Sequence, residues 1–386
     1  MTCQRVAGSL AAALVVLLPL GCMPAPPAPD PPAQPFVFRS LNLRRQDQQG
    51  RLLWTLTSPE TRYDLSRKLA QSRELTGVLY DQGKPRYRFS AANGVVLNDG
   101  ELVQLEGPIR LEQLDEERPL LLTGRRLRWY PDQELMEIDR DPQAASADLV
   151  LTAGLARFLI KQDRLELRRR PVLRQGGEQP LQLEMREVDW TPGNAELKAR
   201  GPIQGQRRLA GGAVQRLTAP GLTGNTTAQT IDLQAPVRLE DPQRQAVIEA
   251  RATRLDLSRR LASSNEPFQG RYGKTSFSGG GFRLDLPSET LVVQGGCRLQ
   301  QPGDRLQADN CRWAWSSGEV EATGAVVLSR EANGLQTTAE RLVGRIGSEG
   351  FAQFTSPGGR VRSELSLPGG GAAAGAGDSG SPLRPD

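Results

Sequence analysis

The middle of the chain repeats one pattern about every 31 residues. In each copy apolar and polar residues alternate, and a Gly or Pro then precedes an apolar residue, as at 102–111, 195–203 and 231–239. The marker position, which holds Gly, Pro or in one copy Ala, recurs every 29 to 34 residues: Gly77, Pro108, Pro142, Pro171, Pro202, Pro236, Pro267, Gly296, Ala325 and Pro357. A period kept over so many units predicts an array of stacked units.

Each unit also has a first half with a two-residue period, seen at 121–130, 181–190 and 247–255. A period of two is typical of β-strands with one buried face. Turn residues such as Pro131 and Asp132 separate the halves, so each unit is predicted to be strand, turn, strand. At about ten residues per strand, the chain is expected to be all-β with roughly twenty strands.

The prolines predict how the strands are bent. One hairpin alone is marginally stable in water, whereas stacked hairpins bury a continuous apolar face. Proline cannot donate to a strand ladder, so a proline at the same place in every unit indicates a bend or an edge there. A sheet bent at the same place in each layer would form a long trough with two open ends.

The composition excludes several kinds of protein. None of the 386 residues is a histidine, which rules out an imidazole metal site, a Ser-His-Asp triad and a histidine base. Aromatic residues are 5% of the chain, and 49 basic residues are mixed with 44 acidic ones, which argues against a nucleic-acid partner. Paired acids such as Glu116 and Glu117 fall in predicted turns. We therefore expect no catalytic residue, no metal site and no cofactor.

The first 22 residues are typical of an export signal. Arg5 precedes an apolar run at 10–18, and Cys22 follows Leu20 and Gly21, as in a bacterial lipoprotein box, although Pro19 departs from that pattern. An ordinary cleaved signal or an uncleaved anchor is the alternative. The proline-rich residues 23–35 predict an extended spacer, 36–368 the repeat domain, and 369–386 a disordered Gly/Ala tail.

Cys297 and Cys311 are the two cysteines left after the signal and the candidate lipid anchor. An exported compartment oxidises thiols, so a disulfide between them is the simplest expectation. The turn residues at 301–304 would fold two strands back and bring the cysteines roughly opposite each other. Closing that loop would stabilise the fold by about 3 kcal/mol in the chain-entropy model.

The repeat unit resembles that of the lipopolysaccharide-transport proteins LptA, LptC and the periplasmic part of LptD. Residues 50–63 are similar to the opening of LptC, with Gly50 before a strand that bears Trp54 and a stretch that ends in Tyr63. Ser58 and Thr61 stand where that family often has Ala. The resemblance covers about 36–367. Two larger departures are the lipoprotein-like start, where LptC has a membrane helix, and a length near twice the usual one.

The resemblance implies an elongated, V-shaped antiparallel β-jelly roll of the OstA type with an apolar interior. It implies a non-enzymatic protein of the periplasm, anchored most simply in the inner membrane. Such proteins receive lipopolysaccharide from an inner-membrane ABC transporter of the LptB/LptF/LptG type. They pass it by edge-to-edge strand pairing to an LptA- or LptD-type jelly roll, and the extra layers of this chain would do part of the work of LptA.

The resemblance also implies a lipopolysaccharide groove. We expect it at the inward positions Leu127, Trp129, Leu155, Val188, Trp190, Leu255 and Trp313. A shift of one residue in the alternation would send them outside. The edge that meets the transporter is expected at Trp54, Leu56 and Tyr63, and arginines at the rim would pair with sugar phosphates. Two alternatives remain, which are a non-catalytic envelope scaffold that binds protein or glycan and a polysaccharide-acting β-solenoid enzyme.

Overall fold

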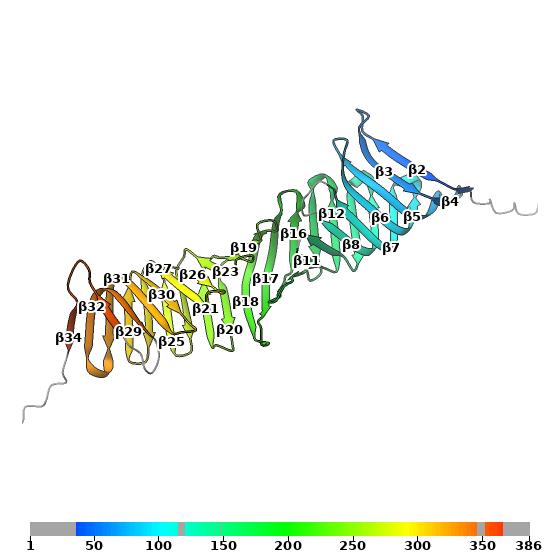
Figure 1. Ribbon diagram of the computed structural model, residues 1–386. Helices are drawn as coiled ribbons and strands as arrows, with labels where there is room; N and C mark the ends of the chain where they lie inside the picture. The colour runs from blue at the N-terminus through cyan, green and yellow to red at the C-terminus, as the bar shows by residue number, and fades with distance from the viewer. Residues whose placement is uncertain (1–35, 115–119, 147, 346–351, 366–386) are drawn as a thin grey trace, which may run out of the picture. The chain divides into compact units, whose positions relative to one another are not determined.

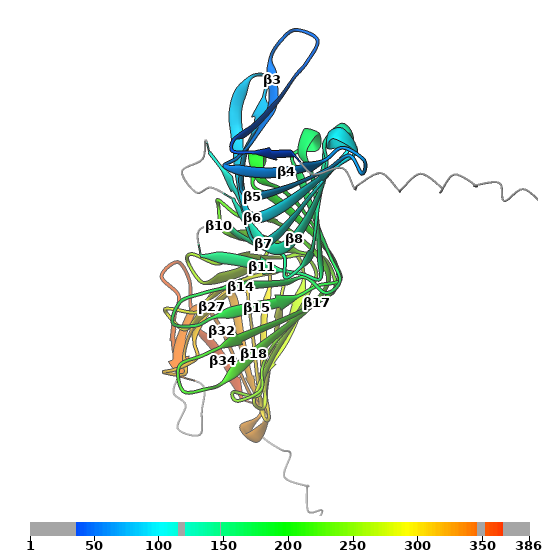
Figure 2. The same ribbon diagram turned by 90° about the vertical axis from the view of Figure 1, so that its right-hand side faces the viewer.

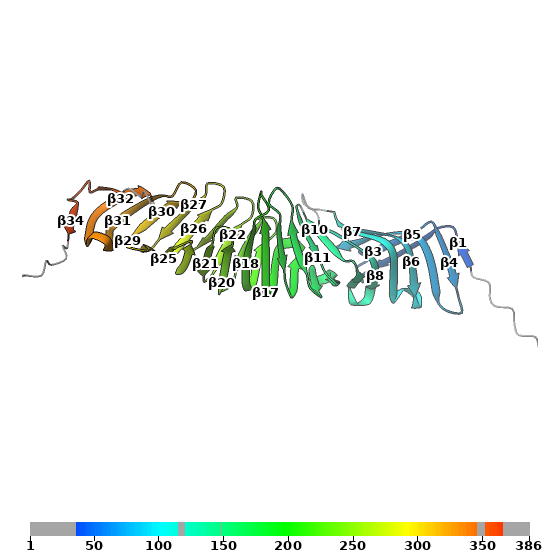
Figure 3. The ribbon, with the colours of Figure 1, turned by 90° about the horizontal axis from the view of Figure 1, so that it is seen from below.

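The computed structural model describes residues 36–114, 120–146, 148–345 and 352–365. These residues form 34 strands that join in one antiparallel sheet, as the all-β prediction requires. Figure 1 shows the strands following one another in chain order from β2 to β34, and Figure 3 shows the same succession from below. In this part of the chain no helix is long and apolar enough to cross a membrane. The predicted signal, Cys22, the spacer and the 369–386 tail lie outside the described residues.

The sheet consists of two ladders of paired strands. Eight long strands run through both ladders: β5 (Leu69–Asp81), β6 (Lys84–Leu97), β7 (Leu102–Gln113), β8 (Leu121–Tyr130), β17 (Glu196–Arg208), β18 (Val214–Asn225), β31 (Glu319–Arg330) and β32 (Leu335–Arg345). All the other strands belong to one ladder each. Figure 2 shows the strands curving between two faces, which correspond to the two ladders.

The first ladder contains one set of short strands. These are β1 (Phe36–Phe38), β4 (Glu60–Asp64), β9 (Leu135–Arg140), β12 (Leu155–Leu159), β13 (Arg164–Arg168), β16 (Glu187–Thr191), β19 (Thr230–Leu233), β22 (Thr253–Asp256), β23 (Leu261–Ser264), β26 (Gly281–Asp285), β27 (Thr290–Gln294), β30 (Asn310–Ala314) and β33 (Ala352–Thr355).

The second ladder contains the others, and five 3-10 turns cap the hairpins. Its short strands are β2 (Leu41–Gln46), β3 (Leu52–Ser58), β10 (Gln143–Ser146), β11 (Leu149–Thr152), β14 (Val172–Gln175), β15 (Leu181–Glu184), β20 (Val237–Asp241), β21 (Ala246–Ala250), β24 (Phe268–Tyr272), β25 (Thr275–Gly279), β28 (Cys297–Gln301), β29 (Asp304–Ala308) and β34 (Arg362–Leu365). The turns are η1 (Asn98–Gly100), η2 (Pro131–Gln133), η3 (Ile160–Gln162), η4 (Pro192–Asn194) and η5 (Glu331–Asn333).

The repeated markers lie where the chain passes from one ladder to the other. In the long strands the pairing register shifts across Pro108, Pro202 and Ala325. The other markers, apart from Gly77, fall in the breaks between successive short strands. At the Pro202 bend the preceding residue must be glycine, since a Cβ on Gly201 would lie 1.9 Å from the Pro220 carbonyl oxygen.

Two details of the sequence prediction are wrong. The expected twenty strands become 34, because the bend interrupts most of the predicted ten-residue strands and leaves two short ones. Gly77 lies within β5, and that strand instead bends at Glu74, whose φ is 49°. A bend needs a residue that tolerates positive φ or gives up a ladder hydrogen bond, and more than one residue type meets that need.

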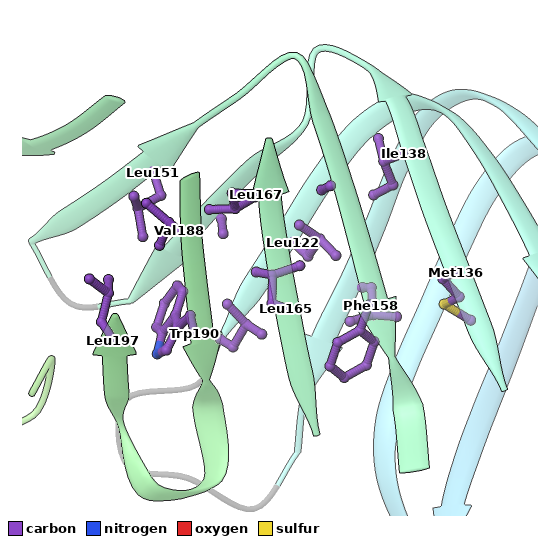
Figure 4. Close-up of a cluster of buried hydrophobic side chains, with 14 of the residues drawn as sticks. Leu122, Met136, Ile138, Leu151, Phe158, Leu165, Leu167, Val188, Trp190 and Leu197 are labelled. Carbon is purple, nitrogen blue, oxygen red and sulfur yellow. The ribbon is translucent and has the colours of Figure 1, made fainter. Parts of the chain in front are cut away.

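The inward side chains of both ladders pack into two apolar clusters. The first runs from Leu56 to Leu257 and the second from Ile248 to Leu342, so they meet near residue 250. Figure 4 shows part of the first cluster, where Phe158, Trp190 and Leu165 point into the space between the strands. Burial of apolar surface and contacts between aromatic rings both stabilise the cluster. The alternation of side chains along each strand directs these residues into it.

A buried polar contact joins three hairpins at one rim of the sheet. The Tyr87 hydroxyl donates to Asp163, and the other carboxylate oxygen accepts the Gly193 backbone N–H at 2.7 Å and pairs with Arg86 at 2.9 Å. Burial, together with the hydrogen bond to Asp163, raises the pKa of Tyr87, so its phenol stays protonated. Tyr87 lies 76 positions before Asp163 and Gly193 lies 30 positions after it, so the contact fixes hairpins that are distant in the sequence to each other.

Cys297 and Cys311 form a disulfide with their Cα atoms 5.8 Å apart, as the sequence predicted. Contrary to the sequence prediction, the two cysteines are not opposite each other in one hairpin, because the residue opposite Cys297 in its hairpin is Ala308. Cys311 lies on β30, in the other ladder, and both cysteines are buried. The bond therefore ties the two ladders together across the interior.

Trp129 offers a test of this core. Its side chain is 1% exposed and packs edge-on against Trp54 and Phe89, with ring centroids 5.2 and 5.4 Å away. Trp129→Ala is expected to lower the free energy of unfolding in urea by about 3–5 kcal/mol, because it leaves a cavity. Leu65→Ala, at an exposed turn position, should change that free energy by less than about 0.5 kcal/mol. A loss below about 1 kcal/mol for Trp129→Ala would contradict close packing here.

Candidate binding groove

A groove of about 450 Å³ opens where the two apolar clusters meet. Leu239 and Leu255 pack against both clusters and lie in its wall. The apolar lining comes from both ladders and from turns beside them, and it includes Leu181, Leu209, Leu217, Leu239, Ile248, Leu255, Leu257, Leu284, Leu286, Leu291, Phe277, Trp313 and Trp315. Its volume is in the range of small-molecule sites, which is about 300–1,000 Å³.

Small side chains at some inward positions help to open the groove. Ala246 and Ala262 line it from β21 and β23, where strands of the first cluster have Trp129, Phe158 or Trp190 at inward positions. Small residues on facing strands leave a volume that neighbouring side chains do not fill, whereas protein interiors are otherwise close-packed. Ala250, Ala262 and Ser264 alternate with larger buried residues such as Ile248 and Phe268, so the sequence signal for this site is weak.

Four of the predicted groove residues lie in the packed first cluster. Leu127, Trp129, Val188 and Trp190 are all between 0% and 2% exposed. Their inward direction agrees with the predicted alternation, but they fill the interior and do not border the open groove. Leu255 and Trp313 do line the groove, so the structure brings these two of the seven residues together there.

Leu155 lies on the other face of its strand, contrary to the prediction. On β12 the buried residues are Ala156 and Phe158, and Leu155 stands opposite Arg168 with intermediate exposure. Gly154 next to it belongs to the break between β11 and β12, where one residue outside the alternation shifts the phase. This break cannot be recognised in the sequence, because Gly154 is one of many glycines in the chain.

The strands that carry the predicted partner edge are not the outermost strands at this end of the sheet. Trp54 and Leu56 lie on β3, which β2 covers on one side, and Tyr63 on β4 pairs with Phe36 of β1. Leu56 is fully buried. Among the described strands, β1 and β2 are the outermost at this end of the sheet, each with one paired neighbour. The short and partly charged segments that form them have too little alternation to be recognised as strands.

Charged residues line the rim of the groove. Arg244 bridges Asp241 at 3.0 Å and Glu289 at 3.4 Å. Burial alone would raise the pKa of Asp241, but hydrogen bonds from Gln215 and Arg244 outweigh it and hold that pKa below its ordinary value. Over the part of the chain that the structure describes, no cluster of three or more acidic or cysteine residues could hold a metal ion. The groove is thus an apolar cavity with an ionised rim.

Residues 8–170 match the model of a known family, described as lipopolysaccharide-assembly, LptC-related. The N-terminal part of the chain is thus similar to the LptC-related family. The groove begins at Gln179, so all of its lining lies beyond the matched residues. The disulfide and the second apolar cluster lie beyond them as well.

One solved structure similar to this chain is LptH from Pseudomonas aeruginosa, described as the LptA homologous periplasmic component of the conserved lipopolysaccharide transport device. It is 12% identical, with a TM-score of 0.26, and the match covers 30% of this chain and 82% of that one. No curated protein matches the chain.

Proposed function

We propose that this protein is a periplasmic component of lipopolysaccharide transport that carries acyl chains in its groove. It would receive lipopolysaccharide from an inner-membrane ABC transporter of the LptB/LptF/LptG type and move it toward the outer membrane. The observation that carries the proposal is an apolar groove inside an antiparallel jelly roll whose N-terminal part is similar to the LptC-related family.

The energetics support a transport role in which no covalent bond is broken. Each methylene moved from water to an apolar site contributes about 0.8 kcal/mol, so exposing a twelve-carbon chain to water costs roughly 10 kcal/mol. A wall of leucine and tryptophan side chains lowers that barrier by replacing the water. Transfer of this kind moves no proton and breaks no bond, which is consistent with a chain that has no histidine.

The two ends of the sheet support a role in a chain of partners. At one end the outer strand β1 exposes Phe36, Val37 and Phe38, each by 46–58%. Exposed apolar residues on an edge strand suit strand addition by another protein. At the other end β33 and β34 each pair only with β32 among the described strands. The first edge would meet the transporter, and the second an LptA- or LptD-type jelly roll.

A lipid on Cys22 would hold the first edge near the inner membrane. The proline-rich residues 23–35, extended at about 3.1 Å each, would span about 40 Å. The repeat domain would then begin at Phe36, within reach of a transporter in the same membrane.

The groove is tested with a photo-crosslinking amino acid in place of Leu255. With the transporter, lipopolysaccharide and ATP present in membranes, a lipopolysaccharide adduct is expected at Leu255. The matched control is the adjacent Arg254, which is exposed on the other face of β22, and no adduct should form there. Equal labelling at both positions, or none at Leu255, would refute transport through the groove and favour the envelope scaffold.

The first edge is tested in the same way at Val37, which is 58% exposed. We expect an adduct with a periplasmic part of the transporter, because strand addition brings partner backbone within reach of this strand. Leu65 is 59% exposed but lies in a turn, and it should give no adduct. An adduct at Leu65 alone would place the partner elsewhere.

The anchor is tested by metabolic labelling with a clickable fatty acid. The wild-type protein and Cys3→Ala should carry the label and sediment with membranes, since Cys3 lies within the proposed signal. Cys22→Ala should lose the label. Labelled, membrane-bound Cys22→Ala protein would exclude lipidation at this cysteine.

A further inference from the structure

Two arginines in the groove form no ion pair with the acidic residues that the structure describes. Arg207 lies near the end of β17, Arg260 lies in the turn between β22 and β23, and both line the cavity. The Nε atom of each is buried, and neither Nε has a hydrogen-bond partner in the described part of the chain. Neither arginine belongs to any ion pair among the described residues. Arg207 and Arg260 will be called the arginine pair.

Each carboxylate that lines the groove is ion-paired with another arginine, although Asp241 and Glu289 share Arg244, and Glu240 shares Arg238 with Glu249. There are four, and each has an ion-pair partner outside the arginine pair at 2.5–3.8 Å: Glu240 with Arg238, Asp241 and Glu289 with Arg244, and Asp256 with Arg259. The remaining basic lining residue, Arg216, is exposed on β18. The arginine pair therefore has no direct carboxylate partner among the described residues, although it lines the same groove as these acids.

Burying the arginine pair without a bound anion costs free energy. Burial lowers the pKa of Arg207, and the positive charge of Arg260 lowers it further. Removing a guanidinium from water without an anion is unfavourable, and two like charges close together add to that cost. Such a cost is typical of functional sites, where a ligand supplies the missing charge. Guanidinium groups suit phosphate oxygens especially well, because their donors form a planar fork.

The apolar wall completes a site for an amphiphile. Leu255, Leu257 and Trp313 line the same cavity as the arginine pair. The indole Nε1 of Trp313 is buried and has no acceptor among the residues described, as is also true of Trp54, Trp129 and Trp190, but among these four only Trp313 lines the groove. It could donate to an ester, amide or hydroxyl oxygen near the start of an acyl chain. An anionic head and an acyl tail in one molecule would satisfy all of these groups.

We infer that Arg207 and Arg260 form a headgroup site that binds the phosphate of an amphiphile whose acyl chain lies against Leu255 and Trp313. The inference deepens the proposed function and rests on it, because it names the part of the carried lipid that is held and where. It also gives the stretch beyond residue 170 a role that the LptC-related stretch does not supply. The arginine pair would bind the lipid in a defined orientation in the middle of the path.

The test compares three probes on the full-length protein by isothermal titration calorimetry, below the critical micelle concentrations. Dodecyl phosphate has the acyl-like chain and the anion, dodecyl maltoside has the same chain without charge, and inorganic phosphate has the anion alone. We expect dodecyl phosphate to bind most tightly. The variant Arg207→Gln/Arg260→Gln should weaken its binding at least about tenfold, since a hydrogen bond to a charged group contributes at least about one order of magnitude. Binding of dodecyl maltoside should change less than about twofold.

Two further variants control for charge and folding. Arg254→Gln removes an exposed arginine outside the groove and should leave all affinities unchanged. The double variant removes unpaired buried charge, so its Tm should equal or exceed that of the wild type. A lower Tm with equal weakening of both dodecyl probes would mean that the arginine pair is structural, and would overturn the inference.

Other outcomes separate this inference from the proposed function. If the double variant binds dodecyl phosphate as well as the wild type does, while lipopolysaccharide still crosslinks at Leu255, only the headgroup site is wrong. If inorganic phosphate binds as tightly as dodecyl phosphate, the pair is a free-anion site and the inference also fails. If neither dodecyl probe binds and no adduct forms at Leu255, the groove carries no lipid and both fail.

Discussion

Backbone hydrogen bonds form two ladders that meet at one bend in every layer, and this bend determines the rest of the structure. Because side chains alternate along a strand, a bend at a constant position directs one face of each ladder into a shared interior. The residues at Pro108, Pro202 and Ala325 make that turn within single strands. Without the constant position, successive layers would not place their apolar faces together, and the interior would not be continuous.

The use of that interior changes along the chain. In the first apolar cluster, Trp129, Trp190 and Phe158 fill it almost completely. Around β21 to β23 some inward side chains are small, among them Ala246 and Ala262, and the same architecture leaves a groove. Close packing stabilises the fold, whereas an opening is stable only at the cost of lost contacts. The protein thus combines a stable section and a binding section in one sheet.

Charge follows the same division. Most arginines lie on solvated strand faces and pair with nearby acids. Arg126, for example, donates hydrogen bonds to Asp139 and thereby lowers the pKa of that carboxyl group. Surface pairs of this kind contribute little to stability. The arginine pair differs because it is inside the groove and unpaired. The disulfide lies farther along the chain and joins the two ladders there, so the groove lies between an aromatic core and a covalent tie.

The all-β class, the position of most bends and the pairing of Cys297 with Cys311 could be predicted from the sequence. These depend on local periodicity, on the missing N–H of proline and on cysteine number, all of which are visible in one chain. The tertiary structure alone decided the phase of Leu155, the identity of the edge strands and the location of the groove. The phase depends on a single break in the alternation, and an edge depends on which strand has no neighbour. A groove depends on the summed volume of side chains from many strands, which no single strand reveals.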